Sequence, residues 1–456
     1  MTPVFPQRFL PLFVAALLWG SHLPAEAGDA SAPRATPAMT EALSTPEKPA
    51  IVSPAATQIR VKVEPIQEAT VVPEPEKAGE TTDKKADKKA DEKAGAPVGD
   101  KPKVKAAENV AGKAAPAAKS RLSTSDYLAQ KEVRDFLKKL SADKKIPLAW
   151  LESEVAVARY SPLTEKYTTP KPKADVKVTP DKNFRLYKRN LVNEERIERG
   201  VAFLAENAKA FADAEARTGV SRYAIAAIIG VETIYGKNMG RFRVLDALMT
   251  LSFDYPRRAK YYRGELAAFL DFCWQQQVKP VSVKGSFAGA MGLGQFMPSS
   301  MEAYGRDGDG DGLIDTVNVP ADGIMSVANF LKVHGWVPGL APLYTAKASD
   351  AIFRATGSGG IKAHTTLAAL QKAGVKGLDA HALSADEPLL LVDLPMTEPV
   401  THKKRTEWYV GTRNFAAILR YNRSYFYAAA VSMLADAIRE REASLAAQTK
   451  NSKAPG

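Results

Sequence analysis

The sequence predicts a mainly α-helical protein, formally α+β, in which helices dominate and one small mixed insert interrupts them. Two observations support this fold class. Apolar residues recur at helical spacing from about residue 123 to residue 217, and again from 414 to 441. Between 338 and 400 the pattern changes to glycine-rich and β-prone runs with one short helix, 366–373.

The first 27 residues have the three parts of an export signal. Arg8 supplies the positive charge, residues 9–20 form the apolar run, and 25–27 is a small-x-small cleavage site. The apolar run is shorter than the roughly 20 residues of a membrane-spanning helix. No cysteine lies near the cleavage site, so the sequence predicts an exported protein that is not a lipoprotein. An uncleaved leader would instead tether the chain to the inner membrane.

Residues 28–120 are rich in Ala, Lys and Pro and contain almost no aromatic side chains. Such a segment buries too little apolar surface to offset the entropy cost of ordering, so we predict a disordered linker. The whole chain carries 63 Lys and Arg against 51 Asp and Glu, a formal net charge of +12. This charge favours an anionic partner, and nucleic acid, anionic lipid and cell-wall polymer all meet that condition.

Cysteine and histidine usage argues against a disulfide and against three kinds of functional site. Cys273 is the only cysteine, so neither an intramolecular disulfide nor a cysteine-based metal site can form. It stands inside the apolar run 269–274, which favours core packing over a role as nucleophile. The five histidines are scattered without an HExxH pair, which argues against a zinc hydrolase.

These patterns divide the chain into seven segments. They are a signal peptide (1–27), the linker (28–120), a helical N-terminal domain (121–220), a central core (221–337), the α+β insert (338–412), C-terminal helices that complete the core (413–445) and a flexible tail (446–456). Within the N-terminal domain, helices are expected at 148–160 and 193–217, and the Pro- and Lys-rich stretch 161–182 is expected to be a loop.

The segment 221–236 predicts a helix that carries one acidic residue on its apolar face. Ser221 can cap its first amides, and Gly236 suits a left-handed C-terminal position. The residues three, four and seven positions before Glu232 are all isoleucine, so its carboxyl shares the apolar face. Burial there would raise the pKa of Glu232, as a general acid requires. A core ion pair with an arginine is the alternative, and spacing alone does not separate the two.

Two further motifs follow this helix. FDYPRR at 253–258 ends in adjacent Arg257 and Arg258, and residues 284–300 form a loop of Gly and Ala that also carries Ser286 and Gln295. No Lys-Ser/Thr pair follows the glycines and no strand precedes them, so a sugar site is favoured over a phosphate site. Glu265 is the nearest acidic rival to Glu232, and we interpret it as an exposed residue at the start of a helix.

These motifs resemble the lytic murein transglycosylase B family closely. The resemblance covers roughly residues 125–440 and rests on GVET (230–233), FDYPRR, GSFAGAMGLGQFMPSS, SVANF, HGW and RYNRS. It implies a lysozyme-like catalytic domain with a helical N-terminal domain and a small insert, acting in the bacterial periplasm. It also implies that Glu232 is the catalytic acid and base. The residues matched to the family's glycan cleft are Ser286, Gln295, Arg257, Arg258, Tyr187, Asn422, Tyr427 and Phe330.

The reaction that this resemblance implies needs one carboxyl and no cofactor. Glu232 would protonate the glycosidic oxygen between N-acetylmuramic acid and N-acetylglucosamine. The C6 hydroxyl of the muramic acid would then attack C1, leaving a 1,6-anhydro end. A muramidase-type hydrolase and a non-catalytic peptidoglycan-binding scaffold are the alternatives. The expected partners are peptidoglycan strands and other cell-wall enzymes rather than nucleic acid, and the chain is expected to be a monomer. The family pattern often has Tyr in place of Phe330, so a hydroxyl contact to sugar would be absent.

Residues 307–315 read DGDGDGLID, which fits the opening of an EF-hand calcium loop. Position 12 of such a loop should be Glu but is Asn318, and Asp322 stands four residues later. The resembling family carries a loop with a late Asp, which implies one structural Ca²⁺. A metal-free turn is the alternative, and whether Asn318 or Asp322 completes the site stays open. The expected ligands are Asp307, Asp309, Asp311, the Leu313 carbonyl and Asp322.

Overall fold

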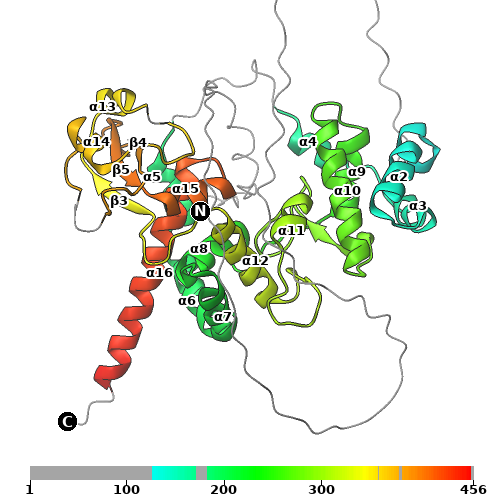
Figure 1. Cartoon of the computed structure of the whole chain (residues 1–456), viewed down its shortest axis with the longest axis horizontal. Coiled ribbons are helices and arrows are strands. Elements are labelled where there is room, and N and C mark those ends of the chain that lie inside the picture. The colour runs from blue at the N-terminus through cyan, green and yellow to red at the C-terminus, as the bar shows by residue number, and fades with distance from the viewer. Residues whose placement is uncertain (1–125, 171–181, 358, 379–382, 453–456) are drawn as a thin grey trace, which may run out of the picture. The chain divides into compact units, whose positions relative to one another are not determined.

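The computed structural model describes residues 126–170, 182–357, 359–378 and 383–452 (Figure 1). The predicted signal peptide and linker lie outside these residues. No helix in the described part is long and apolar enough to span a membrane.

Helices form all the regular structure described before residue 220. They are η1 (Tyr127–Ala129), α2 (Lys131–Lys144), α3 (Leu148–Ala156), α4 (Pro162–Thr168), α5 (Phe184–Leu191), α6 (Glu194–Glu206) and α7 (Ala208–Thr218). The predicted loop at 161–182 is wrong for its first part, because Ser161 caps α4 and Pro162 occupies its first turn. The helix predicted at 148–160 ends four residues early, at Ala156.

The central segment contributes the most deeply buried helix. Its elements are α8 (Arg222–Thr233), β1 (Phe242–Arg243), α9 (Val244–Phe253), α10 (Ala259–Gln275), η3 (Pro280–Ser282), β2 (Lys284–Gly285), α11 (Pro298–Tyr304) and α12 (Pro320–Val333). The Ser221 side chain accepts a hydrogen bond from the Tyr223 amide, as predicted. The helix ends at Thr233, and the backbone then takes positive φ at Ile234, Tyr235 and Gly236.

The insert is a three-stranded antiparallel sheet with two short helices. Its elements are β3 (Leu343–Ala346), α13 (Asp350–Ala355), α14 (Leu367–Lys372), β4 (Leu390–Thr397) and β5 (Lys404–Gly411). The strand order is β3-β5-β4, so the last strand lies in the middle. Leu390 pairs with Gly411 and Thr397 with Lys404. Strand β4 also contacts α5 and α16, which joins the insert to the helical part.

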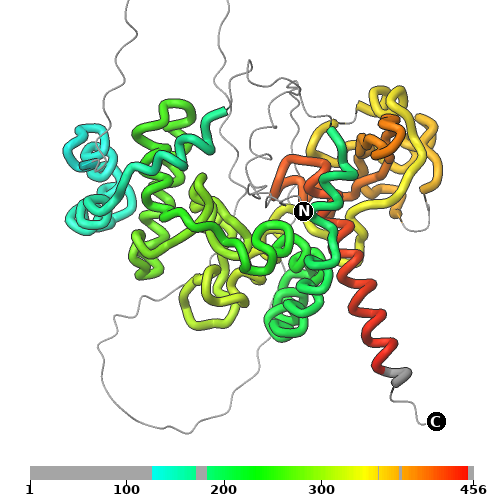
Figure 2. Tube along the Cα trace, turned by 180° about the vertical axis from the view of Figure 1, so that it is seen from behind, coloured from blue at the N-terminus to red at the C-terminus, as the bar shows by residue number. Residues whose placement is uncertain are grey.

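Two C-terminal helices complete the hydrophobic core. They are α15 (Arg413–Tyr421) and α16 (Tyr425–Ser452). Helix α16 packs against α8, α6 and α5, and Figures 1 and 2 show it in red beside the green helices α6 and α7. The prediction of a flexible tail from 446 is wrong up to residue 452, because α16 continues to Ser452. Cys273 is buried in the core, as predicted.

Candidate active site

Glu232 is the penultimate residue of α8, and its side chain is 8% exposed. Helices α6, α12 and α16 pack around α8. Burial raises the pKa of Glu232 to about 7, and a hydrogen bond from Tyr427 opposes part of that rise. A carboxyl with this pKa is about half protonated near neutral pH, so it can both give and take a proton there.

Tyrosine hydroxyls from three elements surround this carboxyl. The Tyr427 hydroxyl on α16 donates to Glu232 Oε1 at 2.6 Å. Tyr421 on α15 stacks parallel to Tyr427, with ring centroids 6.4 Å apart. Burial raises the pKa of Tyr187, Tyr421 and Tyr427, and the negative charge of Glu232 raises each of them further. All three hydroxyls therefore stay protonated and can donate hydrogen bonds at neutral pH.

No lysine or arginine in the described part of the chain forms an ion pair with Glu232. Burial and the Tyr427 hydroxyl are the influences on its pKa, and no second carboxylate adds to them. The alternative of a core ion pair therefore does not match the structure.

The glycine-rich loop is fixed beside Glu232 by backbone and hydroxyl contacts. Thr233, the next residue after Glu232, places its hydroxyl 3.1 Å from the Leu293 carbonyl. Tyr421 donates to the carbonyl of Gly294. At Gly292 φ is +72°, and an added Cβ would lie 2.0 Å from the Thr316 hydroxyl, so only glycine fits this turn.

Ser286 and Gln295 shape the loop from within. The Ser286 hydroxyl accepts hydrogen bonds from the amides of Ala288 and Ala290 at 3.3 and 3.0 Å. The Gln295 side-chain amide donates to the carbonyls of Met239 and Gly292 at 3.1 and 3.0 Å. These contacts hold the loop against the segment that follows α8.

The other predicted cleft residues lie in different settings. Arg257 and Arg258 are exposed in the turn before α10, where the Arg258 guanidinium lies 4.2 Å from the Tyr261 ring centroid. Asn422 is half-buried and follows the last residue of α15. Phe330 is 6% exposed and stacks on His334, and its contact with sugar stays a prediction.

Sequence reasoning missed Tyr421 and Thr233 as parts of the site. Tyr421 belongs to the RYNRS motif, and Thr233 to GVET, so both lay inside motifs that the resemblance used. Their hydroxyls contact backbone carbonyls of a distant loop, which no local pattern reveals.

The prediction that Glu265 is exposed at the start of a helix is wrong. Glu265 lies in the interior of α10 and is 4% exposed. Its carboxylate accepts hydrogen bonds from the amide and hydroxyl of Ser299 at 3.0 and 2.8 Å. Glu265 thus fixes the first turn of α11, directly after the glycine-rich loop.

Replacing Glu265 by Ala is expected to lower the free energy of unfolding by about 1–3 kcal/mol, because the Ser299 amide loses its acceptor. Glu265→Gln keeps one acceptor oxygen and should lose less. Urea unfolding followed by circular dichroism measures both variants. Equal stability of the Ala variant and the unmodified protein would show that this contact is immaterial.

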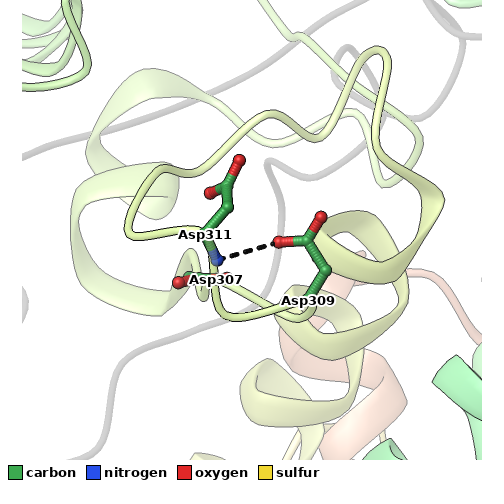
Figure 3. Close-up of side chains that lie close together, drawn as sticks. All are labelled: Asp307, Asp309 and Asp311. Atoms are coloured by element: carbon green, nitrogen blue, oxygen red, sulfur yellow. Dashed lines mark hydrogen bonds between the residues drawn. The ribbon is translucent and has the colours of Figure 1, made fainter. Parts of the chain in front are cut away.

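The acidic loop brings three carboxylates together (Figure 3). Oxygen atoms of Asp307, Asp309 and Asp311 lie within 4.8 Å of one another. Asp307 also accepts amide hydrogen bonds from Gly310 and Gly312, which curls the loop around the cluster. Such crowded, partly exposed oxygens suit a Ca²⁺ ion, which takes carboxylate and carbonyl ligands.

Asp322 stands apart from this cluster. It is 1% exposed, and its carboxylate accepts hydrogen bonds from the amides of Gly308 and Asp315 at 2.8 and 2.7 Å. Burial raises the pKa of Asp322, and the carboxylates of Asp309 and Asp307 raise it further. A cation in the loop would relieve that repulsion. Asn318 donates its side-chain amide to Asp315.

Comparison with known structures defines the class of the fold, which is that of the lysozyme-like lytic transglycosylases. The chain is similar to the catenated lytic transglycosylase SltB1 from Pseudomonas aeruginosa, with 37% identity and a TM-score of 0.62 over 70% of this chain and 100% of that one. It is also similar to Escherichia coli Slt35 in complex with calcium, with 33% identity and a TM-score of 0.59 over 70% of this chain and 96% of that one. SltB3 from Pseudomonas aeruginosa in complex with NAG-NAM-pentapeptide shares 28% identity and a TM-score of 0.57, over 68% of this chain and 79% of that one.

Residues 128–436 match the family described as the Transglycosylase SLT domain, and the chain belongs to this family. Membrane-bound lytic murein transglycosylase B of Escherichia coli K12 is 40% identical over 254 residues, which cover 55% of this chain and 66% of that protein, just under two thirds. The resemblance inferred from the motifs is therefore confirmed, as is the mainly α fold.

Proposed function

We propose that this protein is a lytic transglycosylase that cleaves the β-1,4 bond between N-acetylmuramic acid and N-acetylglucosamine in peptidoglycan, with Glu232 as its single acid and base. The observation that carries the proposal is the buried Glu232 carboxyl, whose pKa is about 7 and which accepts a hydrogen bond from Tyr427. The relatives that match most of this chain are lytic transglycosylases, which supports the reaction type.

The proposed reaction begins with protonated Glu232. It gives its proton to the glycosidic oxygen, and the C1–O bond breaks. The ionised Glu232 then takes a proton from the C6 hydroxyl of the muramic acid as that oxygen bonds to C1. Tyr427 stabilises the carboxylate between the two steps by donating its hydrogen bond.

The proposal uses an internal nucleophile, because the hydrogen-bond partner of the Glu232 side chain in the described structure is the Tyr427 hydroxyl and not a second carboxyl group. Glycosidases that use water or an enzyme nucleophile place two carboxyl groups on either side of the bond. Here the substrate supplies the attacking oxygen, so one carboxyl suffices. The mass of the products tests this point, because a 1,6-anhydro end is lighter than a reducing end by one water. Reducing ends alone would identify a hydrolase, and no cleavage would favour a binding scaffold.

Sugar contacts are proposed for the polar residues around the carboxyl and the loop. Tyr427 donates a hydrogen bond to Glu232, the negative charge of Glu232 raises the pKa of Tyr187, and Ser286 and Gln295 hold the loop. The residues proposed to contact glycan are Tyr187, Arg257, Arg258, Ser286, Gln295, Phe330, Asn422 and Tyr427.

Replacing Tyr427 by Phe is expected to move the alkaline limb of the pH–rate profile to higher pH. The hydroxyl stabilises the ionised carboxylate and so lowers the pKa of Glu232, and its removal lets that pKa rise above about 7. The reactive protonated form then persists to higher pH, while the rate at the optimum falls by about tenfold because the carboxylate intermediate loses a hydrogen bond. Initial rates between pH 5 and 9 measure both effects. An unshifted limb would contradict the assignment of the pKa to Glu232.

Two further parts of the proposal concern calcium and location. We propose that Asp307, Asp309, Asp311, the Leu313 carbonyl and Asp322 hold one structural Ca²⁺, which the calcium complex of Slt35 supports by similarity. We also propose that residues 1–27 direct export to the periplasm. N-terminal sequencing of the protein recovered from a periplasmic extract tests the cleavage after Ala27.

A further inference from the structure

A groove lies outside the cluster around Glu232. It has a volume of about 410 Å³ and lies between the start of α4 and strand β1. Its lining combines apolar surface from Leu163 and Phe242 with guanidinium groups from Arg159, Arg241 and Arg243. None of these side chains hydrogen-bonds to Glu232, Ser286 or Gln295, although the backbones of Phe242 and Arg243 pair with residues 284–285.

Two of the three guanidinium groups form no ion pair in the described part of the chain, although the charge of Arg159 acts on Asp246 from a distance. Arg243 forms an ion pair with Asp246 at 3.4 Å and donates to the Val157 carbonyl at 3.0 Å. The side chains of Arg159 and Arg241 are exposed and have no hydrogen bond or ion pair within the described part of the chain. Asp246 is the only acidic residue of the lining. Its carboxylate already accepts a hydrogen bond from the Arg159 backbone amide and forms the ion pair with Arg243. The groove therefore presents positive charge over apolar surface, which suits a ligand carrying carboxylates.

Strand β1 connects this groove to the glycine-rich loop. Phe242 pairs with Gly285, the residue before Ser286, and its ring lies 6.2 Å from that of Phe287. An added Cβ at Gly240 would lie 2.1 Å from the Gly285 carbonyl, so the two backbones are in direct contact. The groove and the proposed glycan cleft thus share one two-stranded element, β1–β2.

We propose that this groove binds the carboxylate groups of the stem peptide that hangs from the muramic acid of peptidoglycan. The inference rests on the proposed function, because only that substrate brings an acidic peptide to β1–β2. Stem peptides carry free carboxylates on otherwise apolar or neutral residues, which complements Arg159 and Arg241 beside Leu163 and Phe242. A five-residue peptide spans at most roughly 17 Å when extended, so the groove would engage peptide from a muramic acid bound next to Ser286.

The test compares two substrates with one double variant, Arg159→Ala/Arg241→Ala. The substrates are intact peptidoglycan and glycan strands whose peptides have been removed by an amidase. The variant is expected to lose roughly 10- to 100-fold in kcat/KM on intact peptidoglycan, since two charge-assisted contacts disappear. On the stripped strands its kcat/KM should stay within twofold of the unmodified protein. Arg354→Ala/Lys362→Ala removes the same charge from exposed positions of the insert and should change neither rate.

Equal losses on both substrates, or no loss on either, would overturn the inference. Binding of free stem peptide to the full chain, measured by calorimetry, gives a readout independent of cleavage. The unmodified protein should bind the peptide and the double variant should bind it at least tenfold more weakly; equal affinities would also overturn the inference. If the unmodified protein made no anhydro ends on intact peptidoglycan, the proposed function would fail while the calorimetric test of the groove would still stand.

Discussion

Replacing Glu232 by Gln is expected to lower the rate of glycan cleavage on the order of 10³- to 10⁴-fold. Gln has nearly the same shape but cannot give a proton to the glycosidic oxygen or take one from the C6 hydroxyl, so both proposed steps lose their catalyst. Release of anhydro-muropeptides from purified peptidoglycan, quantified by mass spectrometry, measures the effect. Glu195→Gln is the matched control, because Glu195 is exposed on α6 and should leave the rate unchanged.

The Glu232→Gln variant should not lose stability. The pKa of Glu232 is raised from 4.5 to about 7 in the folded protein. The contribution that its protonated carboxyl makes to the stability of the fold is therefore fully present below pH 4.5. That contribution is lost as the pH rises through about 7, and the ionised carboxylate then costs roughly 3 kcal/mol relative to the neutral form. Gln avoids this cost. At pH 8 the Tm of Glu232→Gln should equal or exceed that of the unmodified protein, and at pH 4 the difference should vanish.

These two readouts separate a catalytic from a structural glutamate. A variant that lost both activity and Tm at pH 8 would indicate that Glu232 supports the fold through an interaction of its charged form. Retained activity would exclude it as the acid and base.

The position of Glu232 was predictable because helical spacing fixes which side chains share a face. Its burial follows from the isoleucines before it, and α6, α12 and α16 cover that face. Tyr427 could not be found in this way, since it lies 195 residues from Glu232 along the chain. Only the family resemblance placed it at the site, and the hydrogen bond between the two residues agrees with that placement.

Predictions failed where tertiary packing or a weak start signal decided the outcome. Glu265 looked like an exposed residue, but α10 begins at Ala259 and α11 covers its carboxylate. Helix α4 was missed because lysines and prolines dominated its surroundings, although Ser161 and Pro162 formed a recognisable start. The tail after 446 continues as helix because α16 extends beyond its packed part with exposed residues.

Calcium is expected to raise the Tm of the protein, and chelation to lower it. Three carboxylates whose oxygens lie within 4.8 Å repel one another without a cation, so binding should favour the folded loop over the unfolded chain. At a free Ca²⁺ concentration of 100 times Kd the gain is about 2.7 kcal/mol, which corresponds to a Tm rise on the order of 5 °C. Differential scanning calorimetry in EDTA and in Ca²⁺ measures it.

Variants of this loop identify the ligands. Asp309→Asn removes one charge from the cluster and should abolish most of the Ca²⁺-dependent rise, whereas Asp213→Asn, on the exposed surface of α7, should leave it intact. Asp322→Asn decides how the site closes. If Asp322 binds the ion directly, the variant should lose the calcium response; if Asp322 only accepts the amides of Gly308 and Asp315, the response should persist at a lower Tm. If the Tm of the unmodified protein did not change with Ca²⁺, the loop would be identified as a metal-free acidic turn.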